Sequence, residues 1–170
     1  ADPESASQIH CHNVKRVIRA LEFYHLSGKR ISEHNEKERE KTSPYHFAYF
    51  VLTDERPHLY ANIDKRVDLM IEQGLVDEVQ KLKNMGFHRD MVSMQGLGYK
   101  EILDYLDGKT TLEEAIYIIK RETRHFAKRQ LTWFRRERDV IWLDKQAYDY
   151  QDAKILDSMI NILKEKTIIN

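Results

Sequence analysis

The feature that most constrains the fold is one long amphipathic stretch, residues 112–138. At 3.6 residues per turn, its cations fall on one helical face and its apolar residues on roughly the opposite face. The cationic face contains Lys120, Arg121, Arg124, Lys128, Arg135 and Arg138, and the apolar face contains Leu112, Ala115, Ile116, Ile119, Phe126, Trp133 and Phe134. We therefore expect a long helix that packs one side in a core and presents a row of cations on the other.

Two interpretations of this cationic row differ in function. A solvated helix stabilised by surface salt bridges needs acidic partners, but only Glu122 and Glu137 lie among the eight cations from Lys120 to Arg138. Guanidinium and ammonium groups at this spacing suit a phosphate backbone. The pattern therefore favours binding to a polyanion.

The composition narrows the class of protein. The chain has 28 Lys and Arg against 28 Asp and Glu, so a polyanion site depends on local patches rather than on net charge. No apolar run has the length of a membrane span, and no signal peptide is visible. The single cysteine, Cys11, excludes an internal disulfide and fits a reducing compartment. Its neighbours His10 and His12 lack a second ligand pair at a suitable spacing, so no metal site is predicted. The chain begins at Ala1 rather than at Met, which leads us to expect part of a longer protein.

Capping and turn residues divide the chain into helices and two short strands. Asn13 and Gly28 delimit one helix, and Thr53 or Asp54 is expected to cap the next. Thr110 and Thr111 both start capping-box patterns, with Glu113 and Glu114, for the long basic helix. We expect strands at 45–52 and 140–143, a mobile connection at 32–41, a loop at 88–98, and further helices at 14–26, 54–73, 75–85, 99–107 and 152–166. Two strands are too few for a self-sufficient sheet, so we expect partner strands from elsewhere.

A compact Gly-x-Gly loop is the second candidate for ligand binding. Gly96 and Gly98 let the backbone approach a ligand closely, and the amides at the start of the following helix favour an anion. Gln95 adds hydrogen bonding to base edges, Tyr99 adds a stacking surface and Lys100 adds charge. A Gly-x-Gly turn alone is a weak signal, but this combination favours a nucleic-acid contact.

Arg66 lies at the edge of the apolar stripe of the 54–73 helix. We therefore expect its guanidinium at the boundary of the interior rather than in bulk water, where it needs an anion. From the residues alone, a structural salt bridge to a carboxylate and a bound anion fit this position equally well.

Several blocks of the sequence are distinctive: DPESASQIHCHNVKRVIRALEFYHLSGK, NIDKRVDLMIEQGLVDEV, SMQGLGYKEI, YLDGKTTLEEAI and TRHFAKRQLTWFRR. In their order and spacing they resemble the C-terminal portion of bacterial tRNA dimethylallyltransferase, also called tRNA isopentenyltransferase. The resemblance runs from about Asp2 to Leu143, and the blocks around 95–100 and 127–133 are specific.

The resemblance implies a prenyltransferase that moves a dimethylallyl group from dimethylallyl diphosphate to N6 of the adenosine next to the tRNA anticodon, with Mg²⁺ as cofactor. It also implies an α/β fold, in which a P-loop-type, nucleotide- and ATP-binding core carries a helical insertion that grips the anticodon stem-loop. The target adenine would be flipped out of the loop into a channel. Such enzymes are cytoplasmic, and we expect a monomeric parent enzyme without a membrane partner.

The resemblance also assigns roles to matching residues. Arg66 matches the arginine that contacts the diphosphate and would stabilise the leaving group. The positions that match tRNA contacts are Lys15, Arg16, Arg19, Asp90, Ser93, Gln95, Gly96, Gly98, Tyr99, Lys100, Arg124, Lys128 and Arg129. The family's P-loop and catalytic aspartate have no counterpart here, so no general base and no metal ligand is assigned.

We therefore predict a mostly helical α/β chain that is the C-terminal part of such an enzyme. Residues 1–44 would end the tRNA-gripping insertion, and residues 45–170 would belong to the transferase core, with two short strands that complete a parallel sheet supplied by the N-terminal part. The isolated chain is expected to be catalytically inactive. Two alternatives stay open: a non-enzymatic RNA-binding module, and an adenylate isopentenyltransferase acting on a free nucleotide, against which the basic segments argue.

Overall fold

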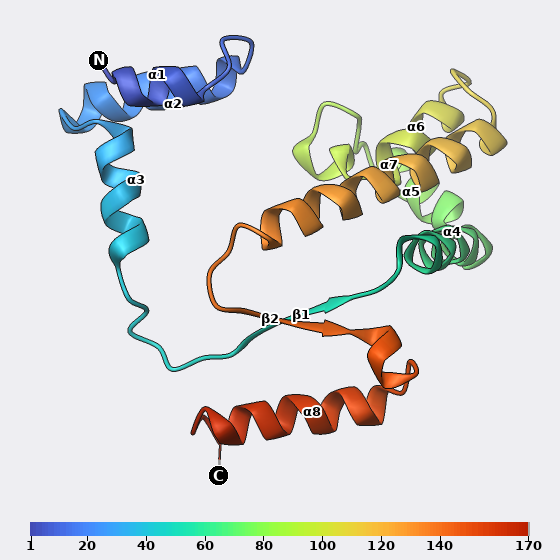
Figure 1. The fold of residues 1–170 in the computed structure, drawn as a ribbon. Helices are drawn as coiled ribbons and strands as arrows, with labels where there is room; N and C mark the ends of the chain where they lie inside the picture. Colours follow the sequence, from blue (N-terminus) through green and yellow to red (C-terminus); the bar gives the residue numbers. More distant parts are fainter. Residues whose placement is uncertain (170) are drawn as a thin grey trace. The chain divides into compact units, whose positions relative to one another are not determined.

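The computed structural model describes residues 1–169 and divides into two compact units, Ala1–His46 and Phe47–Asn170 (Figure 1). Each unit has packing contacts of its own. The functional division that the sequence predicts after residue 44 stays a prediction.

The first unit consists of α1 (Pro3–Gln8), α2 (Val14–Ser27) and α3 (Ile31–Glu40). α2 begins and ends as predicted. The Asn13 side chain accepts a hydrogen bond from the amide of Arg16, which caps the first turn. Gly28 closes the helix with a φ of 67°, a left-handed conformation that glycine adopts without strain.

The mobile connection predicted for residues 32–41 is wrong, because this segment forms α3. Glu, Lys and Arg are good helix formers, and ion pairs one turn apart, such as Lys41 with Glu38, support the helix. The first turn is also anchored by Asp2, whose carboxylate accepts hydrogen bonds from the amide and the hydroxyl of Ser32. A polar segment is therefore ordered by local pairs and by one contact distant in the sequence.

In the second unit, β1 (Tyr49–Thr53) and β2 (Val140–Asp144) form a two-stranded parallel sheet (Figure 1). The two strands pair side by side over their whole length, from Tyr49 opposite Val140 to Thr53 opposite Asp144. Both predicted strands are confirmed. The first begins at Tyr49 rather than at residue 45, because β2 offers a hydrogen-bonding partner only from there onward.

The remaining elements are α4 (Arg56–Glu72), α5 (Leu75–Asn84), the 3₁₀ helix η1 (Val92–Gln95), α6 (Tyr99–Leu106), α7 (Leu112–Phe134), the 3₁₀ helix η2 (Lys145–Tyr148) and α8 (Asp152–Glu165). The predicted helices are confirmed, and Thr111 caps α7 by accepting a hydrogen bond from the amide of Glu114. The predicted cap of α4 is wrong. Glu55 takes the N-cap position without a side-chain hydrogen bond, since the Asp54 carboxylate pairs instead with the His58 ring at 2.5 Å.

The hydrophobic core of this unit lies where α4, α5, α6 and α7 meet, with η1 at its side. Its buried residues are Val67, Leu75, Val79, Met94, Ile102, Leu103, Ala115 and Ile119. Each large apolar side chain buried here contributes roughly 1.5–3 kcal/mol to folding. α7 packs in the core through Ala115 and Ile119, which lie in its first half. The second half of α7 extends beyond this core.

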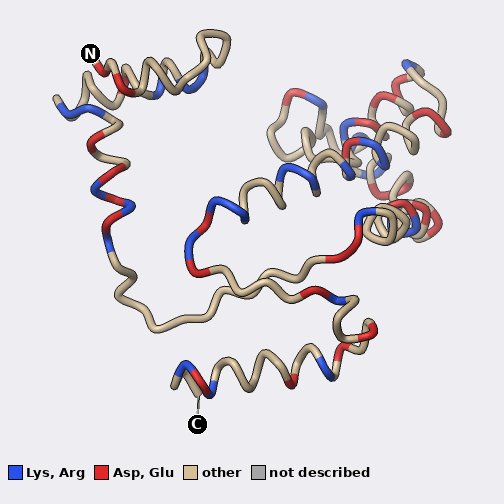
Figure 2. Tube along the Cα trace, viewed as in Figure 1, with Lys and Arg blue, Asp and Glu red and all other residues tan. Residues whose placement is uncertain are grey.

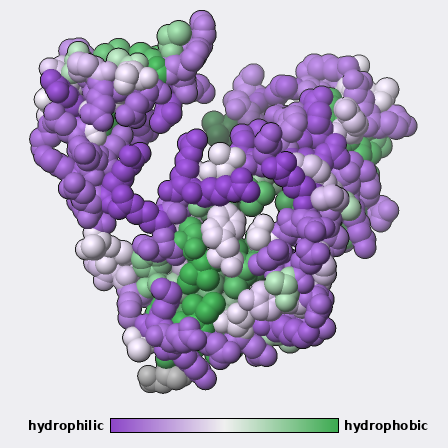
Figure 3. Space-filling view, viewed as in Figure 1, coloured by the Kyte–Doolittle hydropathy of each residue, from purple (hydrophilic) through white to green (hydrophobic). Residues whose placement is uncertain are grey.

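Apolar surface is exposed in the region of the two strands (Figure 3). Leu52 on β1 is 49% exposed, Trp142 on β2 is 39% exposed and Leu156 on α8 is 56% exposed. A single pair of strands is also short of an independently stable sheet. The pairing of this sheet with further strands stays a prediction.

Candidate nucleic-acid interface

Helices α4 and α7 pack in antiparallel directions, and the end of the pair nearest the core has balanced charges. Lys120 Nζ on α7 lies 2.6 Å from a carboxylate oxygen of Asp68 on α4. A guanidinium nitrogen of Arg124 donates to both carboxylate oxygens of Asp64, at 2.9 and 2.7 Å. Two cations of the predicted row are therefore neutralised by the neighbouring helix.

This neutralisation contradicts the expectation that the basic helix has few acidic partners. The expectation counted acids on α7 itself, whereas Asp64 and Asp68 lie 60 and 52 residues away in the chain from Arg124 and Lys120. Only the fold brings them together, so no local sequence signal identifies them. Arg124 thus has a structural partner besides the tRNA contact that the resemblance implies.

The second half of α7 carries exposed cations and exposed rings, and Figure 2 shows Lys and Arg recurring along this helix. The side chains of Lys128 and Arg129 are exposed and make no hydrogen bond or ion pair within the described part of the chain. Arg129 lies over the Phe126 ring, 5.8 Å from its centroid, and Trp133 is 53% exposed. The prediction that Phe126 and Trp133 pack in a core is wrong, because the core surrounds the first half of α7 and no described element covers these rings.

The cationic row is also shorter than predicted, because α7 ends at Phe134. Arg135 is its C-cap residue, and Arg138 lies beyond the helix. Asp139 then has a φ of 59° as the chain turns into β2. An open groove along the end of the helix is lined by His125, Lys128, Arg129, Thr132, Trp133 and Arg136. Cations beside an exposed indole suit phosphates and stacked bases of RNA.

The Gly-x-Gly loop does not present its amides to a ligand. Gly98 is buried with a φ of 103°, and its N–H donates to a carboxylate oxygen of Glu101 at 2.9 Å. The amides of Tyr99 and Lys100 both donate to the Gly96 carbonyl. Glu101, only 5% exposed, thus occupies the start of α6, and the tRNA contact implied at Gly96 and Gly98 stays a prediction. Lys100 Nζ lies 3.4 Å from the same carboxylate group.

The side chains of this loop divide into an outward and an inward set. Ser93 and Gln95 are exposed on η1, while Met94 between them is 1% exposed and anchors the loop in the core. Tyr99 packs its ring against the core and donates its hydroxyl to Glu78, which raises the pKa of Tyr99. Ser93 and Gln95 are therefore accessible to a ligand, whereas Tyr99 is partly buried, and its predicted stacking role stays a prediction.

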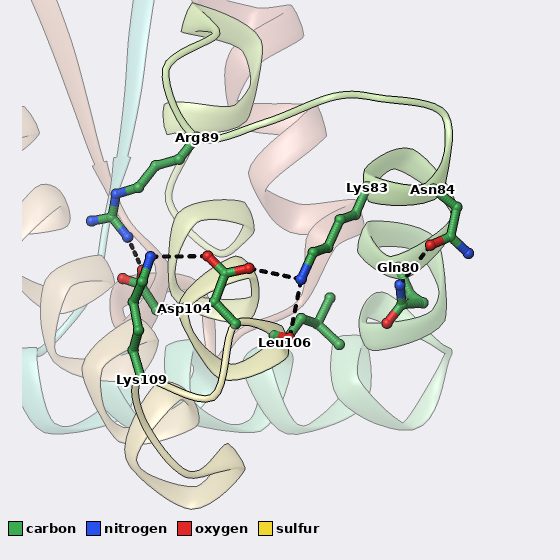
Figure 4. Close-up of polar contacts among 8 residues, drawn as sticks. Gln80, Lys83, Asn84, Arg89, Asp104, Leu106 and Lys109 are labelled. Atoms are coloured by element: carbon green, nitrogen blue, oxygen red, sulfur yellow. Dashed lines mark hydrogen bonds and ion pairs between the residues drawn. The ribbon is translucent and has the colours of Figure 1, made fainter.

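A polar network holds the loop region against α5 and α6 (Figure 4). Arg89 donates to Asp104, and Lys109 Nζ lies 3.4 Å from the same carboxylate. Lys83 and Lys109 donate to Asp107 at 2.7 and 2.9 Å, and these hydrogen bonds lower the pKa of Asp107 to about 2. The segment that precedes η1 is thereby fixed at its base while its tip stays exposed.

The other residues with an implied tRNA contact lie on exposed surfaces. Lys15, Arg16 and Arg19 share one face of α2 in the first unit, and their side chains have no partner among residues 1–169. Asp90 in the second unit is exposed, with a carboxylate oxygen 3.7 Å from His88 Nδ1. All four side chains are accessible, and their assignment to tRNA stays a prediction.

Arg66 is exposed on α4, so its expected position at the boundary of the interior is wrong. Val67 takes the core-facing position instead, and Leu69 nearby is 47% exposed because no described element covers that side of α4. The Arg66 side chain makes no hydrogen bond or ion pair within the described residues. The absence of a carboxylate partner there favours a bound anion over a structural salt bridge.

No three His, Cys, Asp or Glu side chains among residues 1–169 come together so that they could hold a metal ion. No residue of this part of the protein is assigned as a ligand of the Mg²⁺ that the family resemblance implies, and that cofactor stays a prediction. None of the helices described is both long and apolar enough to cross a membrane.

Residues 1–137 match the IPP transferase family. The tRNA dimethylallyltransferase of Lachnoclostridium phytofermentans is 59% identical over 168 residues, which cover 99% of this chain and 53% of that protein. The tRNA dimethylallyltransferase of Acetivibrio thermocellus is 50% identical over 158 residues, which cover 93% of this chain and 50% of that protein. The chain thus spans about half the length of the curated relatives it matches.

Solved structures share the fold. The tRNA isopentenylpyrophosphate transferase of Bacillus halodurans has a TM-score of 0.67 and 45% identity, over 98% of this chain and 50% of that one. The tRNA delta(2)-isopentenylpyrophosphate transferase of Staphylococcus epidermidis has a TM-score of 0.70 and 37% identity, over 97% and 52%. A eukaryotic dimethylallyltransferase acting on tRNA has a TM-score of 0.70 and 30% identity, over 85% and 38%. The predicted mostly helical α/β fold is confirmed, and the chain belongs to the IPP transferase family.

Proposed function

We propose that this chain is part of a tRNA dimethylallyltransferase, which transfers a dimethylallyl group from dimethylallyl diphosphate to N6 of the adenosine next to the anticodon. The observation that carries the proposal is the 59% identity over 99% of the chain to a tRNA dimethylallyltransferase. The exposed cations and indole at the end of α7 favour an RNA substrate over a free nucleotide. A cytoplasmic, monomeric parent enzyme is part of the same proposal.

In the proposed reaction, the lone pair of N6 attacks the allylic carbon of dimethylallyl diphosphate. The bond between that carbon and the diphosphate oxygen breaks, its electron pair leaves with diphosphate, and N6 loses a proton to a base. The unpaired guanidinium of Arg66 would stabilise the charge that develops on the diphosphate. No residue of this chain is assigned as the base, and no step is assigned to Mg²⁺, which remains part of the proposal for the parent enzyme.

Arg66 tests the chemistry in the full-length enzyme that contains this chain. Arg66→Gln is expected to lower kcat roughly 100- to 1,000-fold, since one charge that stabilises the leaving group is lost. Transfer of a labelled dimethylallyl group to an anticodon stem-loop RNA measures the effect. Lys65→Gln is the matched control, because Lys65 is the adjacent exposed cation without a described partner. Equal rates for the two variants would exclude this role of Arg66.

The alternatives are separated by two further measurements. The 170-residue chain alone is expected to bind the stem-loop RNA without transferring the dimethylallyl group, because it offers no assigned base. A full-length protein that binds RNA but gives no transfer with any tRNA would favour a non-enzymatic RNA-binding module. Displacement of the stem-loop by AMP at comparable concentration would favour an adenylate isopentenyltransferase.

A further inference from the structure

The end of the α4–α7 pair away from the core encloses a small cavity lined by cations. Arg56 from the first turn of α4 lines it together with Lys128 and Arg135 from the end of α7, and Tyr60 and Thr132 are also part of its lining. The volume of the cavity is about 100 Å³, and no acidic residue is among those that line it. We call this cavity the α4–α7 cation pocket.

The charges of the α4–α7 cation pocket are uncompensated in the structure. The side chains of Arg56, Lys128 and Arg135 make no hydrogen bond or ion pair within residues 1–169. Like charges around one cavity repel each other, and more strongly where water is partly excluded. The N-terminus of α4 adds positive partial charge through the amides of Arg56 and His58, since Glu55 gives them no side-chain cap and Pro57 has no N–H. An anion in the pocket would therefore relieve a repulsion that the described residues leave in place.

The donors of the pocket suit a phosphate group. Arg56 and Arg135 offer planar forks of N–H donors, and Lys128 offers a compact point charge. The hydroxyl of Tyr60 has no partner in the described part of the chain and supplies a further donor. The Thr132 hydroxyl is already used, because it donates to the Lys128 carbonyl at 3.0 Å.

We propose that the α4–α7 cation pocket binds a backbone phosphate of RNA. Continuity with the open groove supports this source of phosphate, since Lys128 and Thr132 line both the pocket and the groove that contains Trp133. A strand whose base stacks on the Trp133 indole would have its phosphates within reach of the pocket. The choice of RNA rests on the proposed function, whereas the phosphate chemistry rests on the three cations. Free diphosphate shares that chemistry and is distinguished by the test.

The test compares charge-neutral variants of the 170-residue chain in binding to an anticodon stem-loop RNA over a series of salt concentrations. Arg56→Gln and Arg135→Gln are each expected to weaken binding roughly tenfold and to reduce the slope of log Kd against log salt by about 1, because one phosphate contact is lost. Arg56→Lys should keep the slope and lose only part of the affinity, since it keeps the charge without the fork.

The matched control is Lys65→Gln, which removes the same charge from the opposite side of α4. Unchanged circular dichroism of all variants checks that they fold. If Arg56→Gln and Arg135→Gln keep the affinity and slope of Lys65→Gln, the pocket is not an RNA phosphate site, and the proposed tRNA function stands. If neither the unaltered chain nor the full-length enzyme binds the RNA, the assignment to RNA and the proposed function both fail.

Titration of the ¹⁵N-labelled chain with inorganic phosphate and with diphosphate tests the anion chemistry independently of RNA. Shifts of the Tyr60 and Thr132 amides that disappear in Arg135→Gln support the phosphate site, and the lack of any shift overturns it. A strong response to diphosphate together with unaltered RNA binding by Arg56→Gln would assign the pocket to free diphosphate and overturn the RNA assignment.

Discussion

The two ends of the α4–α7 pair use the same residue types in opposite ways. At the end near the core, the Arg124 guanidinium donates to both carboxylate oxygens of Asp64, so charge is balanced within the fold. At the other end, Arg56, Lys128 and Arg135 surround a cavity that no carboxylate lines. One end of the α4–α7 pair therefore has neutralised cations, and the other end has cations that are free to bind an anionic ligand.

The apolar residues of α7 follow the same division. Ile119 is 2% exposed at the balanced end, whereas Phe126 and Trp133 at the other end are 48% and 53% exposed. Packed side chains and paired charges stabilise the fold, while exposed rings and unpaired cations contribute little to it. The comparison shows that one amphipathic helix contains a packing half and a binding half, which helical periodicity alone does not distinguish.

The largest expected effect comes from a substitution in the packing half of α7. Ile119→Ala should lower the free energy of unfolding by roughly 2–4 kcal/mol, because it leaves a cavity in the core. Phe126→Ala on the same helical face should cost about 1 kcal/mol or less, since half of that ring is already exposed. Urea denaturation followed by circular dichroism measures both. Equal destabilisation by the two changes would remove the distinction between the halves.

A smaller effect is expected from a change that turns the balanced end of the α4–α7 pair into a second RNA-binding end. Asp64→Asn removes the charge that neutralises Arg124, so the guanidinium becomes available one turn from Lys128. We expect stem-loop RNA to bind several-fold more tightly with a salt slope steeper by about 1, while the free energy of unfolding falls by about 0.5–1 kcal/mol. Anisotropy titrations over a salt series and urea denaturation measure the two changes.

The control for this change is Glu72→Gln, which removes the same charge from an exposed residue of α4 without a described partner. If both variants bind RNA more tightly than the unaltered chain and with equal affinity, the cause is a general effect of net charge. The pairing of Arg124 with Asp64 would then have no specific part in keeping that end of α7 from RNA.

Local chemistry was sufficient to predict most elements of the fold. Asn13, Gly28 and Thr111 delimit helices by hydrogen bonds and backbone conformations that depend on residues within one turn. The segment 32–41 was mispredicted because its polar composition suggested mobility, although its ion pairs and good helix formers favour α3.

The site was harder to predict because its chemistry depends on tertiary contacts. The neutralisation of Arg124 requires Asp64 from another helix. The sequence does not predict a role for Arg56, because only the antiparallel packing of α4 and α7 brings it close to Lys128. The closure of the Gly-x-Gly loop did have a local signal, since Glu101 stands at the capping-box position of α6.

The smallest expected effect concerns another set of balanced charges in the same unit, the polar network around Asp107 that joins α5 and α6. Lys83 and Lys109 hold the pKa of Asp107 at about 2, below its ordinary value of 3.8. Because the pKa is lower in the folded state, the stabilisation is present above about pH 3.8 and is lost as the pH falls toward 2. Acid should therefore lower the melting temperature of the unaltered chain more than that of Asp107→Asn. Asp157→Asn, at an exposed position of α8 without a described partner, should keep the full acid response. If Asp107→Asn keeps it as well, paired charges add little to this unit, and the contrast between the two ends of α7 rests on apolar packing.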